Sequence, residues 1–202
     1  MNKPTSQRFS IKFFLLPLLI AFISTLFELL DPQITLALRF DREAILDGEV
    51  WRLISGNFVH LGWNHLWMNL AGLFLIWMLF ARFFNFGQWL FIIVTSAAAV
   101  GGGLLVLNLE LNWYVGLSGL LHGMFIAGVI KAIMLGYRAE ILLFILLTGK
   151  LIWEQISGAL PGSVDLAGGN VVVDAHLYGA IAGLICAALL AIQQRFNHSM
   201  QS

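Results

Sequence analysis

The stretch "YVGLSGLLHGM", residues 114–124, opens a long apolar segment with a serine flanked by glycines. His122 follows Ser118 by four residues, so the two side chains share one face of a helix. A lone serine in such a helix is usually a packing residue, because small side chains let helices approach and the hydroxyl bonds back to the preceding turn. Whether Ser118 has a chemical role therefore depends on the polar residues that accompany it.

The composition is that of an integral membrane protein. Of the 202 residues, 59% are hydrophobic and 11% are charged, whereas soluble domains are roughly one quarter charged. The mean hydropathy is +0.87. The formal net charge is zero, so we expect no nucleic-acid partner. The one cysteine, Cys186, excludes a disulfide framework and a zinc ribbon.

Six segments approach the roughly 20 apolar residues that a helix needs to cross a bilayer. They are residues 13–30, 65–84, 89–107, 116–135, 141–156 and 171–192. Basic residues precede the first segment, but no small-residue cleavage site follows it, so we interpret it as a retained span. We therefore predict an all-α, six-helix membrane bundle that forms a single domain over residues 1–202. Short cytoplasmic tails at 1–12 and 196–202 are expected to flank a membrane core at about 13–195.

The fifth segment is short and contains Lys150 and Glu154, which are four residues apart. Side chains at this spacing lie on one face of a helix, so the two are positioned to pair within the membrane. The sequence predicts no function for this pair.

The basic residues predict the orientation, because cytoplasmic ends of spans carry an excess of Lys and Arg. Both termini are expected in the cytoplasm, so spans two, four and six all begin at the outer face. Their first turns contain polar side chains at one level: His65, Asn69, Ser118, His122, Asp174 and His176. Ionisable groups in a membrane usually face the bundle interior or a water-filled cavity. The three helices are therefore predicted to share one site.

Glycines spaced by four predict that two of these helices pack closely, because each pair makes a smooth stripe on a helix face. The pairs are Gly119 with Gly123, and Gly179 with Gly183. Close packing brings Ser118 within reach of His176, and a nucleophilic serine needs a base at hydrogen-bond distance. The alternative for His176 is a buried neutral histidine bonded to a backbone carbonyl.

As a base, His176 accepts the serine proton and returns it to the leaving amine. Asp174 precedes it by two residues and does not share its face, so we interpret Asp174 as a charge that favours the N-terminal end of its helix. We therefore predict a Ser–His dyad rather than a triad. His122 shares a face with Ser118 and stays a competing candidate for the base.

The stretch "HLGWNHLWMN", residues 60–69, supplies further donors. His65 and Asn69 share a helix face, whereas His60 lies off it. Histidine and asparagine side chains, together with the backbone N–H of a serine nucleophile, are suited to stabilise an oxyanion. A metal site is not expected, because no carboxylate or cysteine accompanies them at ligand spacing. Trp51 and Arg52 lie in an interfacial loop and are expected to be structural.

Taken together, these motifs resemble the rhomboid family of intramembrane serine proteases. The matching residues are Trp51, Arg52, His60, His65, Asn69, Gly116, Ser118, Gly119, Ala175, His176 and Gly179, and the resemblance covers about Val50 to Gly183. It implies Ser118 as nucleophile, His176 as base, and an oxyanion hole of His65, Asn69 and the Ser118 N–H. It also implies a water-filled cavity that opens outward, with the fifth span moving for substrate entry.

The short core and the stretch "GLSGLLHG" look most like the rhombosortase branch of that family. The branch is associated with exported proteins that carry a GlyGly-CTERM tail, namely a glycine-rich motif, a membrane span and a basic end. The resemblance therefore implies cleavage of a peptide bond near that tail, which releases or re-anchors the exported protein. The expected location is a bacterial inner membrane, with the site open to the periplasm. His122 stands where many rhomboids carry an aromatic residue, and it orients His176, lines the pocket or binds substrate.

Two other functions stay open. A non-catalytic rhomboid-like protein would bind membrane segments, although a pure binder needs neither the serine nor the histidine. Several histidines near one level also suggest a haem protein, but bis-histidine ligation needs a large flat cavity. The glycine stripes indicate close packing instead, so we expect no cofactor and no metal. The partners expected are the lipid bilayer and membrane-anchored protein substrates, and the sequence predicts no oligomeric state.

Overall fold

The computed structural model describes residues 11–199, which are mostly helical. The long helices are α1 (Ile11–Leu29), α5 (Trp63–Phe80), α6 (Phe86–Leu107), α7 (Ser118–Met134), α8 (Glu140–Ser157) and α10 (Val173–Ser199). The short elements are α2 (Gln33–Leu38), β1 (Phe40–Asp41), α3 (Arg42–Leu46), α4 (Arg52–Ser55), η1 (Ala81–Phe83), β2 (Trp113–Tyr114) and α9 (Ser163–Ala167). Residues 1–10 and 200–202 of the predicted tails lie outside the described residues, and α10 continues into the predicted C-terminal tail as far as Ser199.

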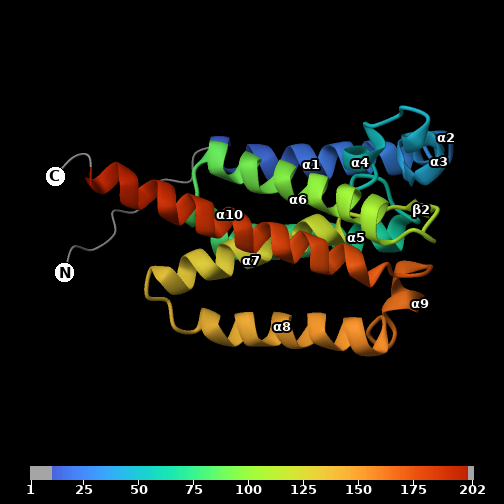
Figure 1. Ribbon diagram of the computed structural model, residues 1–202. Helices are drawn as coiled ribbons and strands as arrows, with labels where there is room; N and C mark the ends of the chain where they lie inside the picture. The colour runs from blue at the N-terminus through green and yellow to red at the C-terminus, as the bar shows by residue number, and fades with distance from the viewer. Residues whose placement is uncertain (1–10, 200–202) are drawn as a thin grey trace.

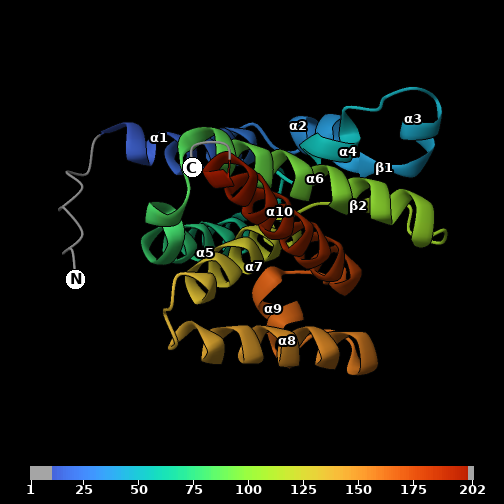
Figure 2. The same ribbon diagram turned by 60° about the vertical axis from the view of Figure 1, so that its left-hand side comes forward.

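The six long helices form one bundle (Figure 1). Helices α5, α7 and α10 begin at the end of the bundle where α9 lies, and α1, α6 and α8 end there. Helix α10 packs against α6 and α7, whereas α8 lies at the edge and packs against α7 and α10 (Figure 2). The first turns of α5, α7 and α10 therefore lie at the same end of the bundle, as the sequence predicts.

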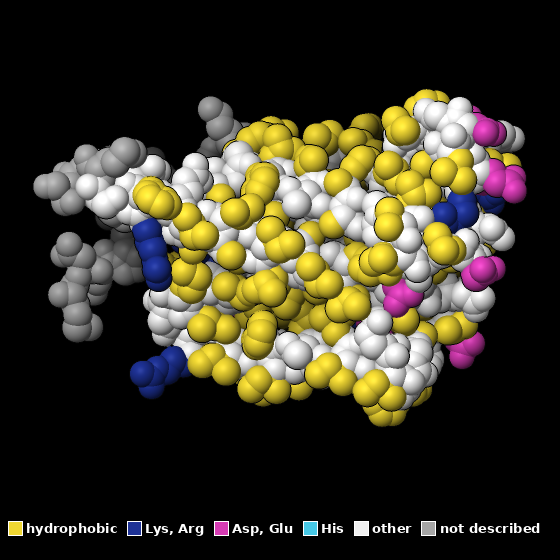
Figure 3. Space-filling view, in the orientation of Figure 1, with side chains coloured by type: hydrophobic (Ala, Val, Ile, Leu, Met, Phe, Trp, Pro, Cys, Tyr) yellow, Lys and Arg dark blue, Asp and Glu magenta, His cyan; other side chains and the backbone are white. Residues whose placement is uncertain are grey.

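Three helical segments within residues 11–199 are long and apolar enough to cross a membrane: Trp63–Phe83, Phe86–Leu107 and Val173–Asn197. The apolar parts of α1 and α7 are shorter, and α8 contains three charged residues. Hydrophobic side chains cover the middle of the face shown in Figure 3, and charged side chains gather at its two ends. This distribution is typical of a protein whose middle lies in a bilayer.

Helices α7 and α10 approach until their backbones touch, because glycines line the contact. A Cβ atom on Gly179 would overlap the carbonyl oxygen of Gly119, and a Cβ atom on Gly183 would overlap that of Gly123. A Cβ atom on Gly119 would lie 2.8 Å from the carbonyl oxygen of Ala175. The predicted close packing of the two glycine stripes is confirmed, and it brings the first turn of α10 against the first turn of α7.

The segment between α1 and α5 is anchored by Arg42, which caps the C-terminal end of α6. Its guanidinium donates hydrogen bonds of 2.8–2.9 Å to the carbonyl oxygens of Leu104, Leu105, Asn108 and Leu111. The last carbonyls of a helix have no partner within the helix, so one planar fork satisfies several of them at once. Next to Arg42, β1 pairs antiparallel with β2, with Phe40 opposite Tyr114.

Arg52 lies in the short helix α4 rather than in an irregular loop. Its buried side chain bonds to other residues of the segment between α1 and α5. It is 8% exposed and donates to Glu49 Oε2 at 2.6 Å and to the carbonyl oxygen of Leu36 at 2.9 Å. The neighbouring Trp51 is exposed. Both positions are therefore consistent with the structural role that the sequence predicts.

An Arg42→Ala variant is expected to unfold at a lower temperature than the wild type in detergent. Loss of the capping fork leaves part-buried carbonyl groups without a donor, which costs about 1–3 kcal/mol. Thermal unfolding followed by circular dichroism measures the change, with Arg138→Ala as the control because Arg138 is exposed. Equal midpoints for the two variants would contradict the capping role.

Candidate active site

Ser118 is the first residue of α7, and the chain turns sharply just before it. Gly116 has φ +130°, a backbone conformation that residues other than glycine rarely adopt. The hydroxyl of Tyr114 donates to the Gly116 carbonyl oxygen at 2.6 Å and holds this turn. The Ser118 Oγ lies 2.9 Å from Nε2 of His176, which is in the first turn of α10 and 5% exposed. The structure therefore brings together the serine and the histidine that the sequence pairs.

The other candidate for the base, His122, contacts different groups. Its ring stacks on that of His176, with centroids 4.2 Å apart and an interplanar angle of 17°. Its Nδ1 lies 2.7 Å from the Ser118 carbonyl oxygen, and its Nε2 lies 3.0 Å from Lys150 Nζ. Both ring nitrogens therefore have partners other than the serine hydroxyl, and the ring supports His176 by packing.

An acidic residue that the sequence did not assign to the site, Glu154 of α8, contacts His176 from the side opposite Ser118. Glu154 Oε2 lies 2.9 Å from His176 Nδ1, and the two side chains are 3% and 6% exposed. A carboxylate only accepts hydrogen bonds, so Nδ1 carries the proton and Nε2 is free to accept from the Ser118 hydroxyl. The structure therefore places an acidic side chain beside the histidine that the sequence analysis paired with Ser118 alone.

The sequence had a signal that could have found Glu154. An ionisable pair inside an apolar helix indicates a functional site by default. Helix α8 runs antiparallel to α10, so its C-terminal part lies at the level of the first turn of α10 (Figure 1). Asp174, the acid nearest to His176 in the sequence, instead accepts a hydrogen bond from the Asn108 side chain.

His65 is oriented so that it can donate toward the start of α7. Its Nδ1 accepts from the backbone N–H of Leu61 at 3.3 Å, so in the neutral ring the proton lies on Nε2. The ring packs against Gly116, where a Cβ atom would lie 2.7 Å from His65 Cε1. Glycine at 116 therefore serves both the turn and the approach of this ring.

Asn69 is 5% exposed, and its Nδ2 has no hydrogen-bond partner within residues 11–199. Together with Ser118 it lines a cavity of about 210 Å³. The other lining residues are Gly72, Ile76, Leu121, His122, Phe125 and Leu147. An unpaired buried donor costs free energy unless a ligand satisfies it, so Asn69 is suited to bind a substrate oxygen beside the serine.

His60 lies before α5 and is 2% exposed, and neither of its ring nitrogens has a partner in the described part of the chain. Burial, together with the neighbouring His65, lowers the pKa of His60 to about 3, so the ring is neutral at physiological pH. The His60 and His65 rings pack edge to face, with centroids 5.1 Å apart and an interplanar angle of 78°. His60 therefore supports the position of His65 by packing.

Three potential metal ligands lie close together at this site. One atom each of His122, Glu154 and His176 lie within 4.8 Å of one another. Lys150 Nζ is 3.0 Å, 2.7 Å and 3.4 Å from His122 Nε2, Glu154 Oε2 and His176 Nδ1 respectively. The ammonium group therefore occupies the position among these atoms that a metal ion would take, and a metal could bind only if Lys150 moved away.

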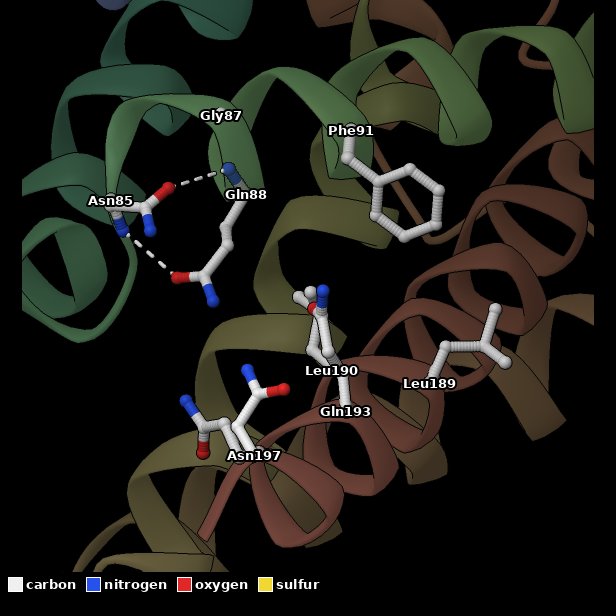
Figure 4. Close-up of a pocket in the computed structure, with 9 residues that line it drawn as sticks. Asn85, Gly87, Gln88, Phe91, Leu189, Leu190, Gln193 and Asn197 are labelled. Carbon is white, nitrogen blue, oxygen red and sulfur yellow. Dashed lines mark hydrogen bonds between the residues drawn. The ribbon is translucent and has the colours of Figure 1, made fainter. Parts of the chain in front are cut away.

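A second cavity, of about 630 Å³, lies at the opposite end of the bundle, between the start of α6 and the end of α10 (Figure 4). Its walls include the amide side chains of Asn85, Gln88, Gln193 and Asn197. Asn85 and Gln88 bond each other's backbone N–H and so cap the start of α6. This cavity contains none of the residues around Ser118.

Comparisons with known proteins identify the family of this chain. The Rhomboid domain family matches residues 47–193. Rhomboid-like protein 11, chloroplastic, from Arabidopsis thaliana is 30% identical over 150 residues, which are 70% of this chain. The chain spans about half the length of that relative, 52%. Because the family match covers most of the chain and every residue around Ser118, this protein belongs to the rhomboid family.

Proposed function

We propose that this chain is an intramembrane serine protease that hydrolyses a peptide bond in or beside a transmembrane segment. The observation that carries the proposal is the 2.9 Å contact between Ser118 Oγ and His176 Nε2 in the first turns of two apolar helices. A serine that only packs a helix interface needs no imidazole acceptor on its hydroxyl.

In the proposed reaction, Nε2 of His176 transfers protons between Ser118, the leaving amine and water. His176 Nε2 takes the proton of the Ser118 hydroxyl while the oxygen attacks the scissile carbonyl carbon. The imidazolium then protonates the leaving amine as the C–N bond breaks, which leaves an acyl group on Ser118. A water molecule, deprotonated by the same Nε2, attacks this ester, and the proton returns to the serine oxygen.

The negative charge on the carbonyl oxygen needs donors that are already in place. His65 Nε2–H, Asn69 Nδ2–H and the backbone N–H of Ser118 are the candidates. The Ser118 N–H lies in the first turn of α7, where helix N–H groups have no partner within the helix. Each such donor contributes a few kcal/mol to stabilising the transition state in other serine proteases.

The proposed setting is a bacterial inner membrane crossed six times, with both termini in the cytoplasm. The site would then open to the periplasmic side, because α5, α7 and α10 all begin at one end of the bundle. Membrane-anchored proteins with GlyGly-CTERM tails are the substrates that we propose. The similarity of the Ser118–His122 stretch to the rhombosortase branch supports this choice.

The test is co-expression with a reporter protein that ends in a GlyGly-CTERM tail. Wild-type protein is expected to shorten the reporter, and Ser118→Ala is expected to leave it intact. Ser96→Ala is the matched control, because Ser96 is a buried serine of α6 whose Oγ has no partner within the described chain. A folded Ser118→Ala variant that still cleaves would overturn the proposal. An inert wild type that co-purifies with the reporter would favour a non-catalytic binder.

A further inference from the structure

We propose that Glu154 is a positioning residue for His176, so that the reaction uses a Ser118–His176–Glu154 triad in which the acid comes from α8. The proposal rests on the proposed function, since it assigns a part in the same reaction. Lys150 is the second positioning residue, because it holds the Glu154 carboxylate. The pair then has the function that its place inside an apolar helix suggests.

The geometry of the carboxylate supports this role. One oxygen, Glu154 Oε2, accepts from His176 Nδ1 at 2.9 Å and from Lys150 Nζ at 2.7 Å. Glu154 lies on α8, the helix at the edge of the bundle, and yet its side chain is only 3% exposed. A carboxylate at this depth is costly to bury unless its bonds are satisfied. The two donors fix its position relative to the imidazole ring.

The charges around His176 explain what the carboxylate adds. When His176 takes the serine proton, a positive charge forms beside the Lys150 ammonium of α8. The stacked ring of His122 accepts from Lys150 through Nε2, so it is neutral. Glu154 is therefore the anion in direct contact with the new charge, and it also keeps the proton on Nδ1 in the resting state.

Because Glu154 lies on α8, its contact with His176 depends on the position of that helix. Helix α8 contacts α7 and α10, and the polar contacts that join it to them include those of Lys150 with His122 and His176 and that of Glu154 with His176. The remaining contact is apolar, with Leu151 packed near Ile126 and Ala180. The orientation of His176 thus depends on α8 being docked against the bundle.

The test measures kcat and KM for the detergent-solubilised protein with a peptide substrate. Glu154→Gln keeps the shape of the side chain and removes its charge, so kcat is expected to fall by roughly 10²-fold or more, with KM changed by less than about threefold. Glu154→Asp is expected to recover part of the lost kcat. Glu140→Gln, at the other end of α8, is the matched control and is expected to behave as the wild type.

A second variant covers the case in which Glu154→Gln does not fold. The double change Lys150→Met with Glu154→Leu removes both buried charges together, which proteins often tolerate. Its kcat is expected to fall as far as that of Glu154→Gln. An unchanged kcat, or a change in KM alone, in either folded variant overturns the role of Glu154. Wild-type protein without activity, or an active Ser118→Ala variant, would instead overturn the proposed function together with this role.

Discussion

Replacing His176 with alanine is expected to lower kcat/KM by at least roughly 10³-fold, because the Ser118 hydroxyl loses the base that accepts its proton. Replacing the stacked His122 with alanine is expected to lower it by less than about tenfold. The two imidazole rings stack with their centroids 4.2 Å apart, but of the two only His176 contacts Ser118 Oγ. The difference between the variants therefore separates the base from the ring that packs against it.

The two histidine variants are compared as purified, folded proteins with the same peptide substrate. Circular dichroism and gel filtration in detergent serve as the controls for folding. Loss of activity in His122→Ala together with retention of activity in His176→Ala would contradict this assignment. The base would then be His122 of α7 and not His176 of α10.

The second large effect is expected from one added methyl group. Gly179→Ala places a Cβ atom on the carbonyl oxygen of Gly119, so α10 must move away from α7. His176 moves with α10, and a displacement of about 1 Å in a catalytic group lowers the rate by roughly 10²-fold. We therefore expect both a loss of activity of this size and a lower unfolding temperature.

Gly149→Ala is the control for the glycine substitution. Gly149 lies in the middle of α8, and a Cβ atom there would meet nothing within 4 Å. Its activity is expected to stay within about twofold of the wild type, because alanine favours a helix and no neighbour has to move. Wild-type activity and stability for Gly179→Ala would show that the tight contact of α7 with α10 does not position the site.

Much of the site could be predicted because its parts follow from helix geometry. Spacings of four residues placed the glycine stripes on helix faces, and the parity of the spans placed three first turns at one level. Those two arguments are sufficient to bring Ser118 next to His176, which the structure places 2.9 Å apart. Neither argument needs the detailed course of the loops.

The parts that were missed depend on packing between distant segments. Glu154 was seen only as the partner of Lys150, because its contact with His176 needs the position of α8 relative to α10. The capping of α6 by Arg42 joins residues more than sixty positions apart, and no local pattern indicates it. The choice between His122 and His176 also required the directions of the two rings, which helix spacing alone leaves open.

The most direct test of the central claim is covalent labelling of Ser118 by a fluorescent fluorophosphonate. Such a probe reacts with a serine whose hydroxyl is activated by a base. Wild-type protein and the Ser96→Ala control are expected to be labelled, and Ser118→Ala is expected to stay unlabelled. Equal labelling of folded Ser118→Ala, or no labelling of an equally folded wild type, would contradict the claim that Ser118 is an activated nucleophile.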